Sequence, residues 1–538
     1  MNPPFEPRQL RQFRVENFIE DLAFNLLNRA LSLLCGWTHG SYVSASINGE
    51  FGLESTSFAH DRQRISEAAR LIDKAIDRSL CCPENYLTRT LNVPTSAPSA
   101  NKNPPLALRR ELNLSSLIAL TFFCVAGGAY GLEDAVGAAG PLIVLLGIMI
   151  LPWLWSFPTA LMTAELSTAM PEDGGYVVWV DKAFGRFWGF QEGWLSWLCS
   201  FVDNALYPVM FVDYLTYLSG DMTPVQRWSI GAALITVITW MNVRGIRLVG
   251  LASIVFTIVV LAPFAVMVGV GAPQVQPSSW LLRTDTIDWA LLLSILLWNT
   301  SGWDNAGCCA AEVANPNRVY PRAMILTVLL VTIVYLLPLA VGVGVDTDWA
   351  EWKEGYFPKV AAQIGGPWLG TWLTLVGLIS AAGMLNALLC TSARVPFAMA
   401  ERGMLPQSLR RLHAHHATPW LAILVNSMGV SLLIPFSFQD LIELDMFLYA
   451  AALILEFAAL IWLRMKAPDL PRPFRIPFGT AGVAAISIPP VALCLASIAL
   501  SNDATRYVGL GGIALGLLVY RWQLKRNPNS EIEAAPTL

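Results

Sequence analysis

The chain has 538 residues, of which 55% are hydrophobic and only 14% are charged, and its formal net charge is −4. Together with a mean hydropathy of +0.51, this composition excludes a water-soluble globular protein and indicates an integral membrane protein with many spans. The nine cysteines show neither metal-ligand spacing nor a disulfide framework. We therefore expect no metal site and no cofactor.

Residues 1–111 differ from the rest of the chain because their charges are dense and mixed. Only the segment from about 61 to 80 has apolar residues at helical spacing, and 91–105 is rich in Pro, Ser and Asn, as a linker would be. Arg and Glu interrupt any apolar core of a signal peptide. We expect a largely disordered cytoplasmic extension; a regulatory tail, a spliced extension and a mispredicted start codon all stay open.

From residue 112 onward, twelve apolar runs of spanning length follow one another with short polar connections. We expect a twelve-helix transporter domain over 112–525 and a short cytoplasmic tail over 526–538. The approximate limits of the runs are 112–138, 141–169, 190–219, 226–243, 246–271, 287–311, 322–345, 367–399, 418–436, 440–464, 480–501 and 505–522.

The first and sixth runs are each interrupted near their middle, and both interruptions carry acid. Residues 125–134 read VAGGAYGLED, and residues 298–304 read WNTSGWD. Backbone within a bilayer must satisfy its own hydrogen bonds, so a Gly-rich break is tolerated only where it lines an enclosed cavity or a substrate site. The breaks therefore predict a transporter's binding site, and the neighbouring carboxylates predict a cationic cargo.

The two breaks lie 175 positions apart (302 minus 127), each in the first span of a possible five-span unit. The first span leaves the cytoplasm and the sixth enters from outside, so the two units have opposite topology, as in many secondary transporters. We expect an all-α polytopic membrane protein built as five plus five plus two helices. For the glycines, close helix packing is the alternative interpretation.

Basic residues cluster in the loops on one side of the predicted spans, whereas only Arg227, Arg283, Lys353, Lys359 and Arg506 lie on the other side. Because cytoplasmic loops carry the excess of Lys and Arg, both termini should be cytoplasmic. The interior of every span lacks Lys and Arg. Acids within spans or at their edges are Glu133, Asp134, Glu165, Glu192, Asp203, Asp304, Glu312, Glu443, Asp445 and Glu456. This census predicts a cavity of negative potential, suited to a cation with more than one amine.

Several short segments carry a family resemblance. They are 127–134 (GGAYGLED), 171–176 (PEDGGY), 189–194 (GFQEGW), 298–304, 311–316 (AEVANP), 455–457 (LEF) and 472–477 (RPFRIP). Over about 112–525 the chain resembles the amino acid–polyamine–organocation superfamily, and within it the polyamine uptake branch of plants and trypanosomatids. The resemblance implies a LeuT-like inverted-repeat fold, proton-driven uptake and the plasma membrane. Asp445 departs from this pattern, since relatives more often have Asn there, and an added acid would tighten cation binding or shift its pH dependence.

The substrate site is predicted from residues at the breaks and on two other spans. Asp203 lies about 13 residues, or roughly 20 Å, into the third span, and Tyr207 shares its helical face. Asp445, Tyr449 and Glu456 share one face of the tenth span. The predicted substrate-binding residues are Gly127, Gly128, Tyr130, Glu133, Asp203, Tyr207, Trp298, Asp304, Tyr449 and Glu456.

Structural roles compete with these assignments. Asp203 would otherwise brace a broken helix, and Glu456 would pair with a cytoplasmic Arg. Asp304 would cap the half-helix that restarts after the second break. Trp298 would simply pack, since the chain has 20 Trp. For Glu165, Glu192 and Glu312, near the cytoplasmic ends of their spans, we expect pairing with loop arginines.

Proton coupling requires a buried carboxylate that gains and loses a proton in the physiological range, and Glu133, Asp203 and Glu456 are the candidates. Sodium coupling would use hydroxyls of the eighth span, for which the only support is Ser380. We therefore expect proton symport of putrescine, spermidine or similar organic cations across the plasma membrane.

Two alternatives to this function stay open. One is a cationic amino-acid transporter of the same fold, and the other is a receptor that binds polyamines without moving them. An enzyme is disfavoured because the five histidines lack ligand-like spacing on any span. The expected partners are the cationic substrate, the co-transported proton and the lipid bilayer. Neither nucleic acid nor an obligate partner subunit is indicated.

Overall fold

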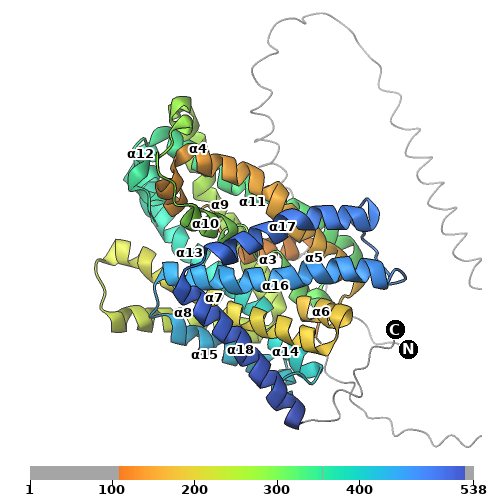
Figure 1. The fold of residues 1–538 in the computed structure, drawn as a ribbon. Coiled ribbons are helices and arrows are strands. Elements are labelled where there is room, and N and C mark those ends of the chain that lie inside the picture. The colour runs from red at the N-terminus through yellow and green to blue at the C-terminus, as the bar shows by residue number, and fades with distance from the viewer. Residues whose placement is uncertain (1–107, 354, 527–538) are drawn as a thin grey trace, which may run out of the picture. The chain divides into compact units, whose positions relative to one another are not determined.

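The computed structural model describes residues 108–353 and 355–526, and the regular secondary structure of this part is helical, with only two isolated bridge pairs. The predicted extension, 1–111, and tail, 526–538, lie outside the described residues except at their inner edges. Loops and short 3₁₀ turns connect the helices (Figure 1). The helices are α3 (Leu114–Val125), α4 (Glu133–Leu151), η1 (Pro152–Ser156), α5 (Phe157–Ala169), α6 (Tyr176–Phe184), α7 (Arg186–Ser219), α8 (Pro224–Arg244), α9 (Ile246–Gly271), α10 (Trp289–Trp298), α11 (Pro316–Val345), α12 (Phe357–Gly365), α13 (Pro367–Ser392), α14 (Arg394–Glu401), α15 (Trp420–Leu433), α16 (Phe438–Lys466), α17 (Gly479–Leu500) and α18 (Asp503–Arg526).

Seven helical stretches of the described part are long and apolar enough to cross a membrane. They are Glu133–Ala169, Arg186–Thr216, Ile246–Gln274, Pro316–Val345, Pro367–Glu401, Phe438–Lys466 and Gly479–Leu500. Three shorter apolar helices, α3, α10 and α15, accompany them. The expectation of an all-helical membrane protein is therefore confirmed, whereas the count of twelve spans stays a prediction.

The first predicted break is present. Helix α3 ends at Val125, α4 begins at Glu133, and residues 126–132 between them are not α-helical. Gly127, Gly128 and Gly131 have φ values of 64°, 115° and 84° there. Glycine adopts these left-handed angles without the steric cost that a Cβ imposes, so the glycines allow the chain to open.

The second predicted break is also present, but the chain resumes differently. Helix α10 ends at Trp298, and two 3₁₀ turns follow, η4 (Asp304–Cys308) and η5 (Ala310–Glu312). The sequence predicted that an α-helical half would restart at Asp304, and this was wrong. Ala126 to Leu132 and Asn299 to Trp303 lie side by side, because the Asn299 side-chain amide donates to the Gly131 carbonyl at 2.9 Å. The two interruptions thus face each other in the interior.

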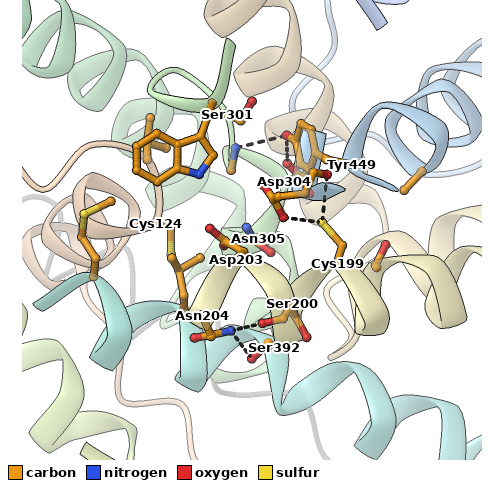
Figure 2. Close-up of a pocket in the computed structure, with 18 of the residues that line it drawn as sticks. Cys124, Cys199, Ser200, Asp203, Asn204, Ser301, Asp304, Asn305, Ser392 and Tyr449 are labelled. Carbon is orange, nitrogen blue, oxygen red and sulfur yellow. Dashed lines mark hydrogen bonds between the residues drawn. The ribbon is translucent and has the colours of Figure 1, made fainter. Parts of the chain in front are cut away.

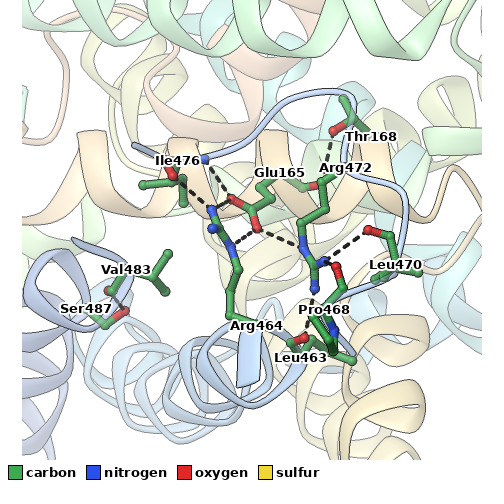
Figure 3. A network of polar contacts seen from close by, with 10 residues as sticks. All are labelled: Glu165, Thr168, Leu463, Arg464, Pro468, Leu470, Arg472, Ile476, Val483 and Ser487. Atoms are coloured by element: carbon green, nitrogen blue, oxygen red, sulfur yellow. Dashed lines mark hydrogen bonds and ion pairs between the residues drawn. The ribbon is translucent and has the colours of Figure 1, made fainter. Parts of the chain in front are cut away.

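A buried ion-pair network joins α5, α16 and the loop after α16 (Figure 3). Both oxygens of Glu165 accept from Arg464 at 2.5 Å, and Arg472 lies 3.3 Å from the same carboxylate. Glu312 similarly accepts from Arg394 at 2.8 Å. The predicted pairing of Glu165 and Glu312 with arginine is confirmed. It was wrong for Glu192, whose carboxylate accepts instead from the Ser196 hydroxyl on its own helix.

Candidate substrate pocket

A pocket lies where the second break meets the faces of α7, α13 and α16 (Figure 2). Its empty space, including the part open to solvent, is about 660 Å³. Of the residues predicted from sequence, it brings together Asp203, Tyr207, Trp298, Asp304 and Tyr449. Pockets lined by apolar surface and a few placed polar groups are typical of small-ligand sites.

Asp203 and Tyr207 form the first acid–aromatic pair of the pocket. They stand four residues apart on α7, and the Tyr207 hydroxyl donates to the Asp203 carboxylate at 2.8 Å. The Tyr207 ring stacks on Trp298 of α10, with ring centroids 6.4 Å apart and an angle of 23° between the planes. The pair therefore presents a carboxylate beside an aromatic wall, a combination that attracts ammonium groups.

Asp304 and Tyr449 form the second pair, from η4 and α16. The Tyr449 hydroxyl donates to the Asp304 carboxylate at 2.5 Å, and its oxygen accepts from the Gly302 backbone N–H at 3.1 Å. Tyr449 thus satisfies an amide freed by the second break and holds Asp304 at the pocket (Figure 2). The sequence suggested Asp304 as the cap of the restarted helix, but the Gly302 amide is capped by Tyr449.

Asp445 is the third carboxylate of the pocket, and the site prediction did not include it. It is 4% exposed and accepts from the Cys199 thiol of α7 at 3.0 Å. Its position four residues before Tyr449 was the available signal, since the two residues share a helical face. The polar group of Asn204, Ser200 and Ser392 was also missed; Asn204 donates to the Ser200 carbonyl at 2.6 Å (Figure 2).

The charges of the pocket have one sign. Among the described residues that line it are three aspartates, Asp203, Asp304 and Asp445, but no Lys, Arg or His. A buried carboxylate without a basic partner is costly unless a cation or a proton neutralises it. In the part of the chain that the structure describes, no three His, Cys, Asp or Glu side chains are grouped as metal ligands. The lining suits an organic cation.

The other predicted site residues lie outside the pocket lining. The carbonyl of Gly127 accepts from the Ser380 hydroxyl, and Gly128 approaches Val260 and Phe264 of α9. Tyr130 donates to the Leu373 carbonyl at 2.7 Å, and its ring contacts Tyr214 and Phe264. These contacts hold the first break against α9 and α13. A direct substrate role for Gly127, Gly128 and Tyr130 stays a prediction.

Glu133 and Glu456 also lie outside the lining. One Glu133 oxygen accepts from the Gly131 N–H at 2.7 Å, which satisfies an amide freed by the first break. Glu456 is 1% exposed, and within the described residues no basic side chain pairs with it. The alternative of an ion pair with a cytoplasmic Arg therefore does not hold for Glu456.

Comparison with known proteins identifies transport proteins of similar sequence. A family model for amino acid permeases matches residues 112–515. Polyamine transporter PUT1 of Oryza sativa subsp. japonica is 42% identical over 415 residues, which cover 76% of this chain and 78% of the relative. Polyamine transporter RMV1 of Arabidopsis thaliana is 37% identical over 437 residues, covering 80% and 89%. The serine/threonine exchanger SteT of Bacillus subtilis is 24% identical over 387 residues, covering 69% and 87%.

Proposed function

We propose that this chain, which belongs to the amino acid permease family, imports polyamines such as putrescine and spermidine by proton symport. As a member of that family it is a membrane transporter and not an enzyme. The relatives that share 37% and 42% of its aligned residues are named polyamine transporters, which supports the choice of substrate.

The observation that carries the proposal is the one-sided charge of the pocket. Asp203, Asp304 and Asp445 come from three different elements, and the described lining offers them no basic side chain. A polyamine carries separated ammonium groups and an apolar chain between them. Carboxylates at several points around Trp298, Tyr207 and Tyr449 match that pattern of charge, and the aromatic faces match the alkyl segments.

For the architecture we propose twelve spans, with an inverted repeat of five and five helices and with the breaks in the first and sixth spans. The residues between α3 and α4 and between α10 and η4 support this assignment, because both interruptions meet at one interior site. Alternating access would occur around that site. The excess of basic residues in the loops on one side supports cytoplasmic termini, and the plasma membrane is the proposed location.

For coupling we propose a proton carried on buried carboxyl groups, with Glu133, Asp203 and Glu456 as the candidates. Glu133 and Glu456 are buried and Asp203 is partly buried. Glu133 and Glu456 each have an oxygen without a hydrogen-bond partner in the described part. A proton taken up there would remove the cost of an unpaired buried charge.

The rival function, transport of a cationic amino acid, would place the α-carboxylate on backbone amides of 127–131. Two of those amides already have acceptors. The Gly127 N–H donates to the Phe122 carbonyl at 3.4 Å, and the Gly131 N–H donates to Glu133. Neither Gly127 nor Gly128 is part of the pocket lining. These contacts disfavour an anion site at the first break.

The test is uptake of labelled putrescine into vesicles that contain the purified full chain and bear an imposed pH gradient. We expect accumulation that spermidine inhibits more strongly than arginine or leucine does. Failure of spermidine to compete would contradict the choice of substrate. Binding of putrescine without accumulation driven by the gradient would instead indicate a receptor that does not transport.

A further inference from the structure

Two buried glutamates, Glu192 of α7 and Glu456 of α16, extend the pocket-facing surfaces of their helices by one turn. On α7, Ser196 is the first residue that lines the pocket, and Glu192 precedes it by four positions. On α16, Ala452 is the last lining residue, and Glu456 follows it by four. A separation of four residues keeps a side chain on the same helical face, about 6 Å further along the axis.

The two glutamates lie toward the same end of the pocket. Helices α7 and α16 pack against each other, and the charge of Glu192 acts on Glu456. Further along α16, Arg464 belongs to the Glu165 network (Figure 3). The proposed topology places that network on the cytoplasmic side. The pair therefore lies between the substrate pocket and the cytoplasm.

Neither carboxyl group is fully satisfied. Glu192 is 0% exposed and Glu456 is 1% exposed. One Glu192 oxygen accepts from the Ser196 hydroxyl at 2.9 Å, which links the pair to the pocket lining. The Oε2 atoms of Glu192 and Glu456 have no hydrogen-bond partner among the described residues. A buried acceptor without a donor costs free energy, unless a bound ligand or proton supplies the hydrogen bond.

The groups that face the pair are acidic or neutral. The charge of Asp304 in η4 acts on Glu456. The charge of Glu456 acts in turn on Cys308 of η4, Tyr176 of α6, Tyr449 of α16 and Cys494 of α17. The basic residues of α7 and α16 nearest in sequence have other partners: Arg186 donates to the Gly403 carbonyl, and Arg464 pairs with Glu165. Among the described residues, none of the charged groups that act on Glu192 or Glu456 is basic.

We propose that Glu192 and Glu456 together bind the coupling proton and share it between them. This proton site lies one helical turn from the substrate pocket, and the inference rests on the proposed function. A shared proton removes the repulsion between two desolvated carboxylates and supplies a donor for their free oxygens. With the proton bound, α7 and α16 can stay closed beneath an occupied pocket. Loss of the proton to the cytoplasm restores the repulsion and opens the substrate's path in the same direction.

The experiment uses vesicles containing the purified full chain, with the membrane potential clamped by potassium and valinomycin. For each proton carried, a gradient of one pH unit can drive roughly a tenfold accumulation of putrescine. The variants are Glu192→Gln and Glu456→Gln. The matched control is Glu443→Gln on α16, because the Glu443 carboxylate accepts from Asn502 and does not line the pocket.

We expect accumulation driven by the pH gradient to fall about tenfold in Glu192→Gln and Glu456→Gln but not in the control. Exchange of labelled for unlabelled putrescine at equal pH should continue in Glu192→Gln, with a rate that no longer depends on pH. If Glu192→Gln loses both accumulation and exchange, Glu192→Asp distinguishes a proton site from a folding defect. Recovery of accumulation with a shifted pH profile supports the proton site, and no recovery overturns it.

Two other outcomes overturn the inference. Glu192→Gln that accumulates putrescine as the wild type does would show that the pair carries no coupling proton. A raised KM for exchange with unchanged proton flux per putrescine would identify a second ammonium subsite instead. A wild-type protein without gradient-driven accumulation would refute proton symport itself, so failure of the proposed function is separate from failure of this pair.

Discussion

Asp203 is the carboxylate of the pocket whose contacts are the most specific to a cation. It accepts from Tyr207 and stands beside the stacked rings of Tyr207 and Trp298. A charge-assisted hydrogen bond contributes about 1.5–3 kcal/mol, so Asp203→Asn should raise the KM for putrescine roughly ten- to a hundredfold. Uptake into vesicles measures this effect. An unchanged KM would remove Asp203 from the site.

Asp445 offers a residue-scale test of amine number. Its recorded partner is the Cys199 thiol, a weak donor, so its charge is available to a third ammonium group. We expect Asp445→Asn to raise the KM for spermidine about tenfold and that for putrescine less than threefold. Parallel uptake of the two amines checks this. Equal effects on both would mean that Asp445 acts on the overall potential only.

At the scale of elements, the glycines of the first break determine whether α3 and α4 can part. Gly128 has a φ of 115°, and an added Cβ would lie 3.0 Å from the Val260 side chain and 3.1 Å from Phe264. Backbone strain of this kind costs on the order of 1–3 kcal/mol. Gly128→Ala should therefore lower the unfolding temperature in detergent and reduce uptake.

The matched control for Gly128→Ala is Gly269→Ala in α9, where nothing lies within 4 Å of an added Cβ. Alanine is favoured over glycine in a helix by about 0.8–1 kcal/mol, so that variant should be at least as stable as the wild type. If both variants behaved alike, the special conformation of the break would not matter.

The Glu165 network is the second feature at this scale, because it fastens the loop after α16 to α5. Removing one partner of a buried ion pair costs about 3–5 kcal/mol. Glu165→Gln should therefore lower the unfolding temperature markedly. Glu172→Gln is the control, since Glu172 pairs with Arg402 while its side chain is 60% exposed, and exposed pairs contribute about 0–1 kcal/mol. Equal stability of the two variants would contradict a structural role for the network.

For the whole molecule, the proposed symport moves net positive charge inward, because the substrate and the proton are both cations. An inside-negative potential should therefore accelerate uptake, by up to about 2.3 kcal/mol per elementary charge for each 100 mV. Potassium diffusion potentials of either sign, imposed at equal pH on both sides, measure this. Uptake that ignores the potential would require a compensating charge movement and would contradict simple symport.

Sequence alone determined the class of molecule, the positions of the breaks and part of the pocket. The apolar runs, the glycines near 127 and 302, and the helical faces that carry Asp203 with Tyr207 and Asp445 with Tyr449 all depend on local rules. Helical spacing placed Asp203 beside Tyr207, and the structure agrees. Such features follow from one segment at a time, so periodicity and steric preference suffice to predict them.

Contacts between distant segments were decided only by the tertiary structure. Packing brought Tyr449 of α16 to Asp304, 145 residues earlier, and Cys199 to Asp445, 246 residues later. It also gave Glu165 its arginines and left Glu192 without one, although the sequence treated the two alike. Spacing along a chain says which residues share a face. Which helix packs on that face depends on the whole bundle. The free energy of a buried charge in turn depends on which partners that packing places beside it.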